Sequence, residues 1–227
     1  MKLLIVSDEE SRKIWNYYEP GMLDGYDLIL SAGDLSPQYL EFLVTMSHAP
    51  VLYVHGNHDE IYEFKPPCGA ISVEDIVYNY KGLRILGLGG CMKYKPGKTY
   101  FTEREMRRRA FRVRPKILLS RGFDILLTHA PAKGVHDGRD LPHRGFETFN
   151  FLIRKYRPAY FIHGHVHKRY GDGYQSVDCI GGTTVINACG TYELEIPDDF
   201  LEGRKSPRKC RREGTVLRDR SEDIYKF

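Results

Sequence analysis

Short apolar runs, each followed by polar residues, recur along the first part of the chain at residues 2–6, 27–31 and 51–55. Runs of this length are typical of buried parallel strands. Between the runs, the pattern changes to helical spacing. The first connection carries Trp15 and Tyr18, and the second begins at Pro37 and continues with Leu40 and Leu43. Proline is favoured at the first position of a helix. This βαβαβ order predicts a mostly parallel sheet within an α/β domain.

The rest of the chain continues with shorter elements. We predict short antiparallel hairpin strands at residues 70–73, 76–80 and 83–88, and further strands at residues 123–128, 159–163, 183–187 and 192–196. Helical spacing predicts helices over residues 102–113 and 146–156. Pro115 is expected to break or restart the first of these helices, because proline lacks a backbone donor. Residues 132–145 are rich in Gly, Asp and His and are expected to form a loop.

Residues that commonly bind metals follow strand after strand, namely Asp8, Glu10, Asp34, Asn57, His58, His129, His165 and His167. In α/β sheets, ligands collect outside the carboxyl ends of the strands. Alternation along an extended chain puts Asp8 and Glu10 on one side and points Glu9 away. Each residue alone has an ordinary explanation as a helix cap, a turn or a surface histidine. Their joint order favours a site for two divalent cations, held about 3.5–4 Å apart by carboxylate, amide and imidazole groups.

These residues belong to short motifs with a fixed order. The motifs are Asp8-Glu9-Glu10, Gly33-Asp34, Gly56-Asn57-His58-Asp59, Thr128-His129-Ala130-Pro131, Gly164-His165-Val166-His167 and a late turn, Asn187-Ala188-Cys189-Gly190. In this order they resemble the motifs of the calcineurin-like metallophosphoesterases. The resemblance covers residues 1 to about 196. It implies a four-layer α/β/β/α sandwich of two mixed sheets.

The resemblance also implies a role for each residue of the site. The metal ligands would be Asp34 as the bridge between two cations, Asp8 and His167 for the first cation, and Asn57, His129 and His165 for the second. His58 would stand beside the site and donate to a phosphate oxygen or to the leaving group. The family has a histidine where this chain has Glu10. We expect Glu10 to bind the first cation through oxygen, with contact through a water or a weak first site as the alternatives.

Such a site would hydrolyse a phosphomonoester or a phosphodiester by attack of a metal-bound hydroxide. Two cations lower the pKa of a shared water and polarise the phosphoryl oxygens. The substrate would be a phosphorylated small molecule or a nucleotide. With Glu10 as a ligand, the first site would be rich in oxygen, which favours Mn²⁺ and leaves Fe, Zn, Ni or Mg as alternatives.

A competing interpretation is a family member with weakened catalysis that acts as a protein- or nucleic-acid-binding scaffold. His58 argues against it, because a scaffold does not need a histidine beside the ligands.

The loop at residues 132–147 lies between two ligand-bearing strands. His143 and Arg144 are its candidate substrate-binding residues, because the loop could cover the site. A polar surface loop is an equal alternative. The helix over residues 102–113 carries arginines on one face, and there a solvated surface is favoured over phosphate binding.

Composition and charge limit the remaining choices. The chain has 227 residues, is 41% hydrophobic and 28% charged, and fits one soluble domain. We place that domain at residues 1–198 and a flexible basic tail at residues 199–227. Residues 203–227 hold nine of the 34 basic groups and four of the 30 acidic groups, so the net charge of +4 belongs to the tail. Nucleic acid is a further partner class for this tail.

The chain is expected to be cytoplasmic, without a membrane partner. It shows no apolar run of the roughly 18–20 residues that span a bilayer, and no signal-peptide core. Its five cysteines are widely spaced and contain no Cys-x-x-Cys, so we expect reduced thiols.

Overall fold

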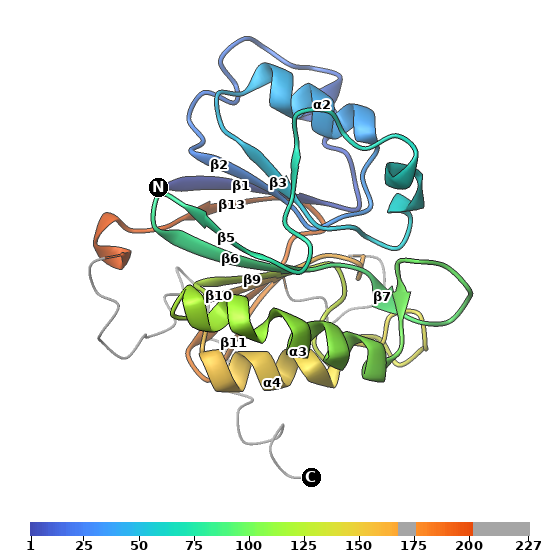
Figure 1. Cartoon of the computed structure of the whole chain (residues 1–227). Coiled ribbons are helices and arrows are strands. Elements are labelled where there is room, and N and C mark those ends of the chain that lie inside the picture. The colour runs from blue at the N-terminus through green and yellow to red at the C-terminus, as the bar shows by residue number, and fades with distance from the viewer. Residues whose placement is uncertain (168–175, 202–227) are drawn as a thin grey trace.

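The computed structural model describes residues 1–167 and 176–201. Within these residues, two large mixed sheets pack face to face, and helices cover their outer faces (Figure 1). Helix α2 (Pro37–Met46) lies on one outer face, and α3 (Glu103–Leu119) and α4 (Glu147–Tyr156) lie on the other. The α/β/β/α sandwich implied by the sequence resemblance is therefore confirmed.

The first sheet has the strand order β13-β1-β2-β3-β4. Its strands are β1 (Lys2–Ser7), β2 (Leu28–Ser31), β3 (Val51–Tyr53), β4 (Ile71–Ser72) and β13 (Gly190–Glu195). Strands β1 to β4 run parallel, and β13 pairs antiparallel with β1. Alternation along β1 sends Leu3 and Ile5 into the core between the sheets, whereas Leu4 and Val6 face α2. Both faces are buried, which explains the unbroken apolar runs.

The second sheet has the strand order β11-β12-β10-β9-β6-β5. Its strands are β5 (Val77–Tyr80), β6 (Leu83–Leu88), β9 (Ile125–Thr128), β10 (Tyr160–His163), β11 (Val177–Ile180) and β12 (Thr183–Asn187). The inner strands β6, β9, β10 and β12 run parallel. Their carboxyl ends therefore meet at one edge of the sheet, as the position of the candidate site requires.

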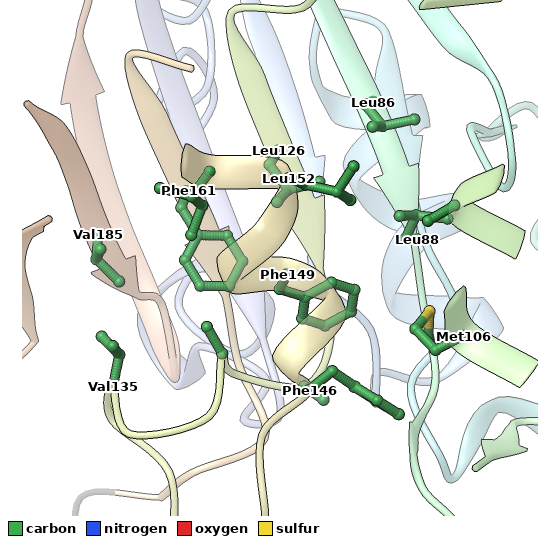
Figure 2. Packing of buried hydrophobic residues seen from close by; sticks show 14 of the residues in the cluster. Leu86, Leu88, Met106, Leu126, Val135, Phe146, Phe149, Leu152, Phe161 and Val185 are labelled. Carbon is green, nitrogen blue, oxygen red and sulfur yellow. The ribbon is translucent and has the colours of Figure 1, made fainter. Parts of the chain in front are cut away.

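Helix α4 covers the outer face of the second sheet through aromatic side chains. Phe146, at its amino end, and Phe149 are fully buried, and the ring of Phe149 lies 6.1 Å from the ring of Phe161 in β10 (Figure 2). Leu152 continues the same face one turn later. Burying one side chain of this size contributes about 1.5–3 kcal/mol. The core thus fixes the loop that precedes α4 against the sheet.

Two helix predictions need correction. Helix α1 covers only Arg12–Trp15, although a helix through Tyr18 was expected. Trp15 and Tyr18 both pack on the ring of Phe42 instead, so a turn of the chain buries them without a longer helix. Helix α3 continues through Pro115 to Leu119. Pro115 lies on the exposed face, where water can bond the carbonyl left without a donor.

The strand predictions were right for the hairpin β5–β6 and wrong nearby. Residues 71–72 form β4, which pairs parallel with β3 in the first sheet rather than in a hairpin. Strands β7 (Cys91–Met92), β8 (Tyr100–Phe101) and β11 were not predicted. Pairs as short as β7 and β8 carry no alternation that a sequence pattern could reveal.

The end of the described chain packs on the domain. After β13, a 3-10 turn η2 (Asp198–Phe200) follows, and Phe200 and Leu201 contact the core between the sheets. The rest of the predicted basic tail, residues 202–227, lies outside the described residues. No helix among the residues that the structure describes is long and apolar enough to cross a membrane.

The cysteines follow the expectation of reduced thiols only in part. Cys68, Cys91 and Cys189 are not in disulfides. Cys179 is disulfide-bonded, so the expectation was wrong for this residue. Disulfide pairing depends on distances in the folded chain, which sequence spacing does not show.

A buried ion-pair network ties α3 to the loops at the site edge. Arg109 of α3 pairs with Glu74 and Asp75 and donates to the Gly89 carbonyl at 2.7 Å. Glu74 also accepts from the backbone amides of His55 at 2.8 Å and Gly89 at 3.1 Å. Burial alone would raise the pKa of Glu74, but the hydrogen bond from His55 and the charge of Arg109 lower it to about 2.

We predict that Glu74→Gln lowers the free energy of unfolding at neutral pH by about 3 kcal/mol, because the buried Arg109 loses one of its two carboxylate partners. The folded-state pKa lies below the ordinary value of 4.5, so this stabilisation is present above pH 4.5 and is lost as the pH falls toward 2. Denaturant unfolding at several pH values measures both effects. Glu147→Gln, which removes the exposed pair with Lys133, is the control and should cost about 1 kcal/mol or less. Equal losses in the two variants would contradict the prediction.

Candidate metal centre

The predicted ligands gather at the carboxyl ends of strands from both sheets. They follow β1 (Asp8), β2 (Asp34), β3 (Asn57), β9 (His129) and β10 (His165 and His167). Hydrogen bonds join the two sheets there, since the amide of His165 donates to Asp8 Oδ2 at 2.9 Å and His129 Nδ1 lies 2.8 Å from the Ala32 carbonyl. The sandwich therefore brings together residues that are far apart in the sequence.

His129 lies at the centre of a tight group of donor atoms. Its Nε2 is 3.0 Å from Asn57 Oδ1, 3.0 Å from His165 Nδ1 and 3.3 Å from Asp34 Oδ2. Asp34, His129 and His165 are all placed so that one ion could contact them. Both histidines and Asn57 are buried. This is the predicted ligand set of the second cation, together with the predicted bridge.

The hydrogen bonds at the far side of each ring decide which nitrogen faces the centre. A carbonyl oxygen only accepts, so His129 donates from Nδ1 to Ala32 and His165 donates from Nε2 to the Pro142 carbonyl at 2.8 Å. When both rings are neutral, His129 Nε2 and His165 Nδ1 present lone pairs to each other. Two lone pairs 3.0 Å apart need a positive charge between them, which a proton on His129 or a bound metal cation supplies.

The pKa values of Asp34, His129 and His165 also indicate that this place favours positive charge. Burial lowers the pKa of His129, but the charge and hydrogen bond of Asp34 raise it to about 10. For His165, burial and then the charge of His129 lower the pKa to about 3. Burial raises the pKa of Asp34, yet the charge and hydrogen bond of His129 bring it to about 2. A cation bound here would replace the proton that His129 otherwise holds.

The ligands expected for the first cation are less tightly arranged. Asp8 Oδ1 lies 3.8 Å from His167 Nε2. Glu10 Oε1 accepts from the Ser36 amide at 3.2 Å and from the Ser36 hydroxyl at the start of α2. Glu9, which alternation was expected to point away, lies 3.6 Å from His167 Nδ1. Ligation by Glu10 stays a prediction.

His58 is placed as a group beside the ligands. Its backbone amide donates to Asp34 Oδ1 at 2.7 Å, and the residue is exposed. The amide therefore holds one oxygen of the expected bridging carboxylate and leaves Oδ2 toward His129. The side chain of His58 is available to a molecule that approaches from solvent.

The comparisons with known proteins agree with this geometry. Residues 6–169 match the family model described as calcineurin-like phosphoesterase. The chain belongs to this family. A protein of Caenorhabditis elegans, named as a member of UPF0046, is 36% identical over 77 residues, which cover 32% of this chain and 17% of that protein's length. The match thus spans less than a fifth of that relative's length.

Solved structures support the fold of this calcineurin-like phosphoesterase. One crystal structure superposes with a TM-score of 0.60 at 13% identity and covers 85% of this chain and 94% of its own. A crystal structure from Thermus thermophilus gives a TM-score of 0.57 at 15% identity, with 83% and 89% covered. At such low identity the likeness concerns the fold alone.

Three of the predicted metal ligands have a strained backbone conformation. Asp8, Asp34 and His165 have φ angles of 63°, 58° and 69°, in the left-handed region that side chains rarely adopt. Such strain costs about 1–3 kcal/mol per residue and concentrates at functional sites. No pattern in the sequence predicts this strain at these three residues.

Asp59 is a supporting residue whose role sequence reasoning missed. Its Oδ2 accepts from the amides of Asp34 at 2.8 Å and Gly56 at 2.7 Å, so it locks two ligand-bearing loops together. Burial and the nearby charge of Asp34 raise its pKa to about 6. Its place in the Gly-Asn-His-Asp motif was the available signal.

The loop before α4 reaches the centre, as expected for His143. That ring lies 5.1 Å from the ring of His165, and its Nδ1 is 2.6 Å from Asp140 Oδ2. The neighbouring Pro142 holds His165 as described. Arg144 is exposed. The structure brings His143 to the centre, and substrate binding by both residues stays a prediction.

We predict that Gly164→Ala weakens divalent metal binding about tenfold or more. A Cβ at this position would meet the Ser7 hydroxyl and the Asp8 carboxylate, so the ligand would have to move. Changes in groups that orient ligands typically cost 10–100-fold in affinity. Titration calorimetry with Zn²⁺ and Mn²⁺ measures the loss. Gly25→Ala, where a Cβ would have nothing within 4 Å, is the control, and similar affinities for both variants would contradict the prediction.

Proposed function

We propose that this chain is a metal-dependent phosphoesterase that hydrolyses a phosphomonoester or a phosphodiester. The observation that supports the proposal most strongly is the pair of buried imidazole nitrogens, His129 Nε2 and His165 Nδ1, which lie 3.0 Å apart beside Asp34. This arrangement stabilises a positive charge, which a bound metal cation can supply. Family membership supports the reaction class.

The residues fit two cations with a shared carboxylate. Asn57, His129 and His165 would hold one, Asp8 and His167 would contribute to the other, and Asp34 would contact both. When bound, two such ions activate a water and polarise the phosphoryl oxygens.

His58 would act on the substrate rather than on the cations. Its exposed ring and its fixed backbone amide place it beside Asp34, where it can donate a proton to the leaving oxygen or a hydrogen bond to a phosphoryl oxygen. Asp140 holds His143 at 2.6 Å and so orients a second ring toward an arriving anion. Arg144 would add a positive charge beside the same anion.

The substrate in this proposal is a phosphorylated small molecule or a nucleotide, and the location is cytoplasmic. The sequence alone supports both points. The Mn²⁺ preference depends on Glu10 as an oxygen ligand and stays a prediction. Glu10 accepts hydrogen bonds from Ser36, so it would have to bind a cation with its other oxygen or give up these bonds.

We expect Asp34→Asn and His58→Ala to separate metal binding from catalysis. Asp34→Asn should remove bound metal and turnover together, because both cations lose their shared charge. His58→Ala should keep its metal and lower turnover by roughly 10²–10⁴-fold, the range for one acid–base group. Elemental analysis and hydrolysis of aryl phosphate mono- and diesters, with added Mn²⁺ or Zn²⁺, measure the two quantities.

Equal metal loss in the two variants would refute the role given to His58. Metal-free parent protein without hydrolysis of either ester would refute the proposed function and favour the scaffold interpretation.

A further inference from the structure

A second group of metal-binding atoms lies at the site edge. Cys189 Sγ is 3.7 Å from His167 Nδ1, and Glu9 Oε1 is 3.6 Å from the same nitrogen. The three ligand atoms all lie within 4.8 Å of one another. This group uses the opposite nitrogen of His167 from the one that faces Asp8.

The fold holds Cys189 at this place. The residue lies two positions after the end of β12, and the pairing of Gly190 with Ser7 sets it beside the end of β1, where Glu9 follows. Its amide donates to Asn187 Oδ1 at 3.2 Å. Asn187 in turn donates to the Val166 carbonyl at 2.8 Å, next to His167. The thiol and the imidazole are thus joined through one asparagine.

The distances match those of ligands around one tetrahedral ion. Zinc binds sulfur at about 2.3 Å and imidazole or carboxylate at about 2.0–2.2 Å, so its ligand atoms lie about 3.3–3.7 Å apart. The Cys189–His167 and His167–Glu9 pairs fall in this range. Cys189 is 3% exposed, whereas the side chains of Glu9 and His167 are 55% and 38% exposed. An ion here would be anchored from inside and open to solvent on the other side.

We infer that Cys189, His167 Nδ1 and Glu9 form a further site for one soft divalent cation, with Cys189 bound as a thiolate. The site goes beyond the proposed function, because it uses the nitrogen of His167 opposite to the one that faces Asp8. The thiolate and Glu9 supply the negative charge that a divalent cation needs.

The chemistry of this ligand set selects a different metal from the one expected at first. Thiolate and imidazole favour Zn²⁺, Co²⁺ or Fe²⁺ over Mn²⁺ and Mg²⁺. The ion beside Cys189 is therefore a soft one.

Cobalt substitution tests the inference on the full chain. Metal is removed with a chelator and Co²⁺ is added. The parent should show a near-ultraviolet thiolate-to-cobalt charge-transfer band. Cys189→Ser should lose that band, and its affinity for Zn²⁺ at this position should fall at least about tenfold while its affinity for Mn²⁺ changes less. Cys68→Ser, which removes an exposed thiol elsewhere, is the matched control and should keep the band.

X-ray absorption of the zinc-loaded parent provides a measurement without a variant, in case Cys189→Ser does not fold. A sulfur neighbour at about 2.3 Å supports the inference. Bound metal with neither the band nor the sulfur neighbour would overturn the thiolate ligand and leave the proposed function standing. Failure of Zn²⁺ and Co²⁺ to bind at all would overturn both.

Discussion

The close approach of His129 Nε2 and His165 Nδ1 is the interaction on which the site depends. Each ring is fixed from behind by a carbonyl, Ala32 for one and Pro142 for the other, so neither can rotate to relieve the contact without losing a buried hydrogen bond. Asp34 adds negative charge at 3.3 Å. The fold therefore builds a place for positive charge before any ion arrives, which is what preorganised metal sites require.

Holding that arrangement strains the backbone, and buried acidic groups supply the restraint. The left-handed conformations of Asp8, Asp34 and His165 persist because neighbouring loops are tied together. Asp59 binds the amides of two of these loops, and Glu74 fixes His55 and Gly89 to the arginine of α3. The carboxylates of Asp59 and Glu74 thus couple the packing of helix α3 to the geometry of the metal centre.

The group around His129 and the site inferred beside Cys189 differ in exposure and in chemistry. The ligands around His129 are buried imidazole, amide and carboxylate groups, whereas those on the Nδ1 side of His167 include an exposed carboxylate and, by our inference, a thiolate. Exposed ligands exchange their ion more readily than buried ones, so the two sites should differ in metal affinity.

Strand positions, the order of the ligand residues and the layered fold could all be predicted from the sequence, because buried parallel strands and their polar ends leave local patterns. The two-residue strands, the helix through Pro115 and the parallel pairing of β4 could not, since each depends on contacts with distant segments. Alternation predicted that Glu10 faces the site and Glu9 points away, whereas in the structure Glu10 accepts from Ser36 and Glu9 lies 3.6 Å from His167. Which nitrogen of each histidine faces the centre, and that Cys189 lies beside His167, were decided only by the tertiary structure, because these depend on packing between two sheets.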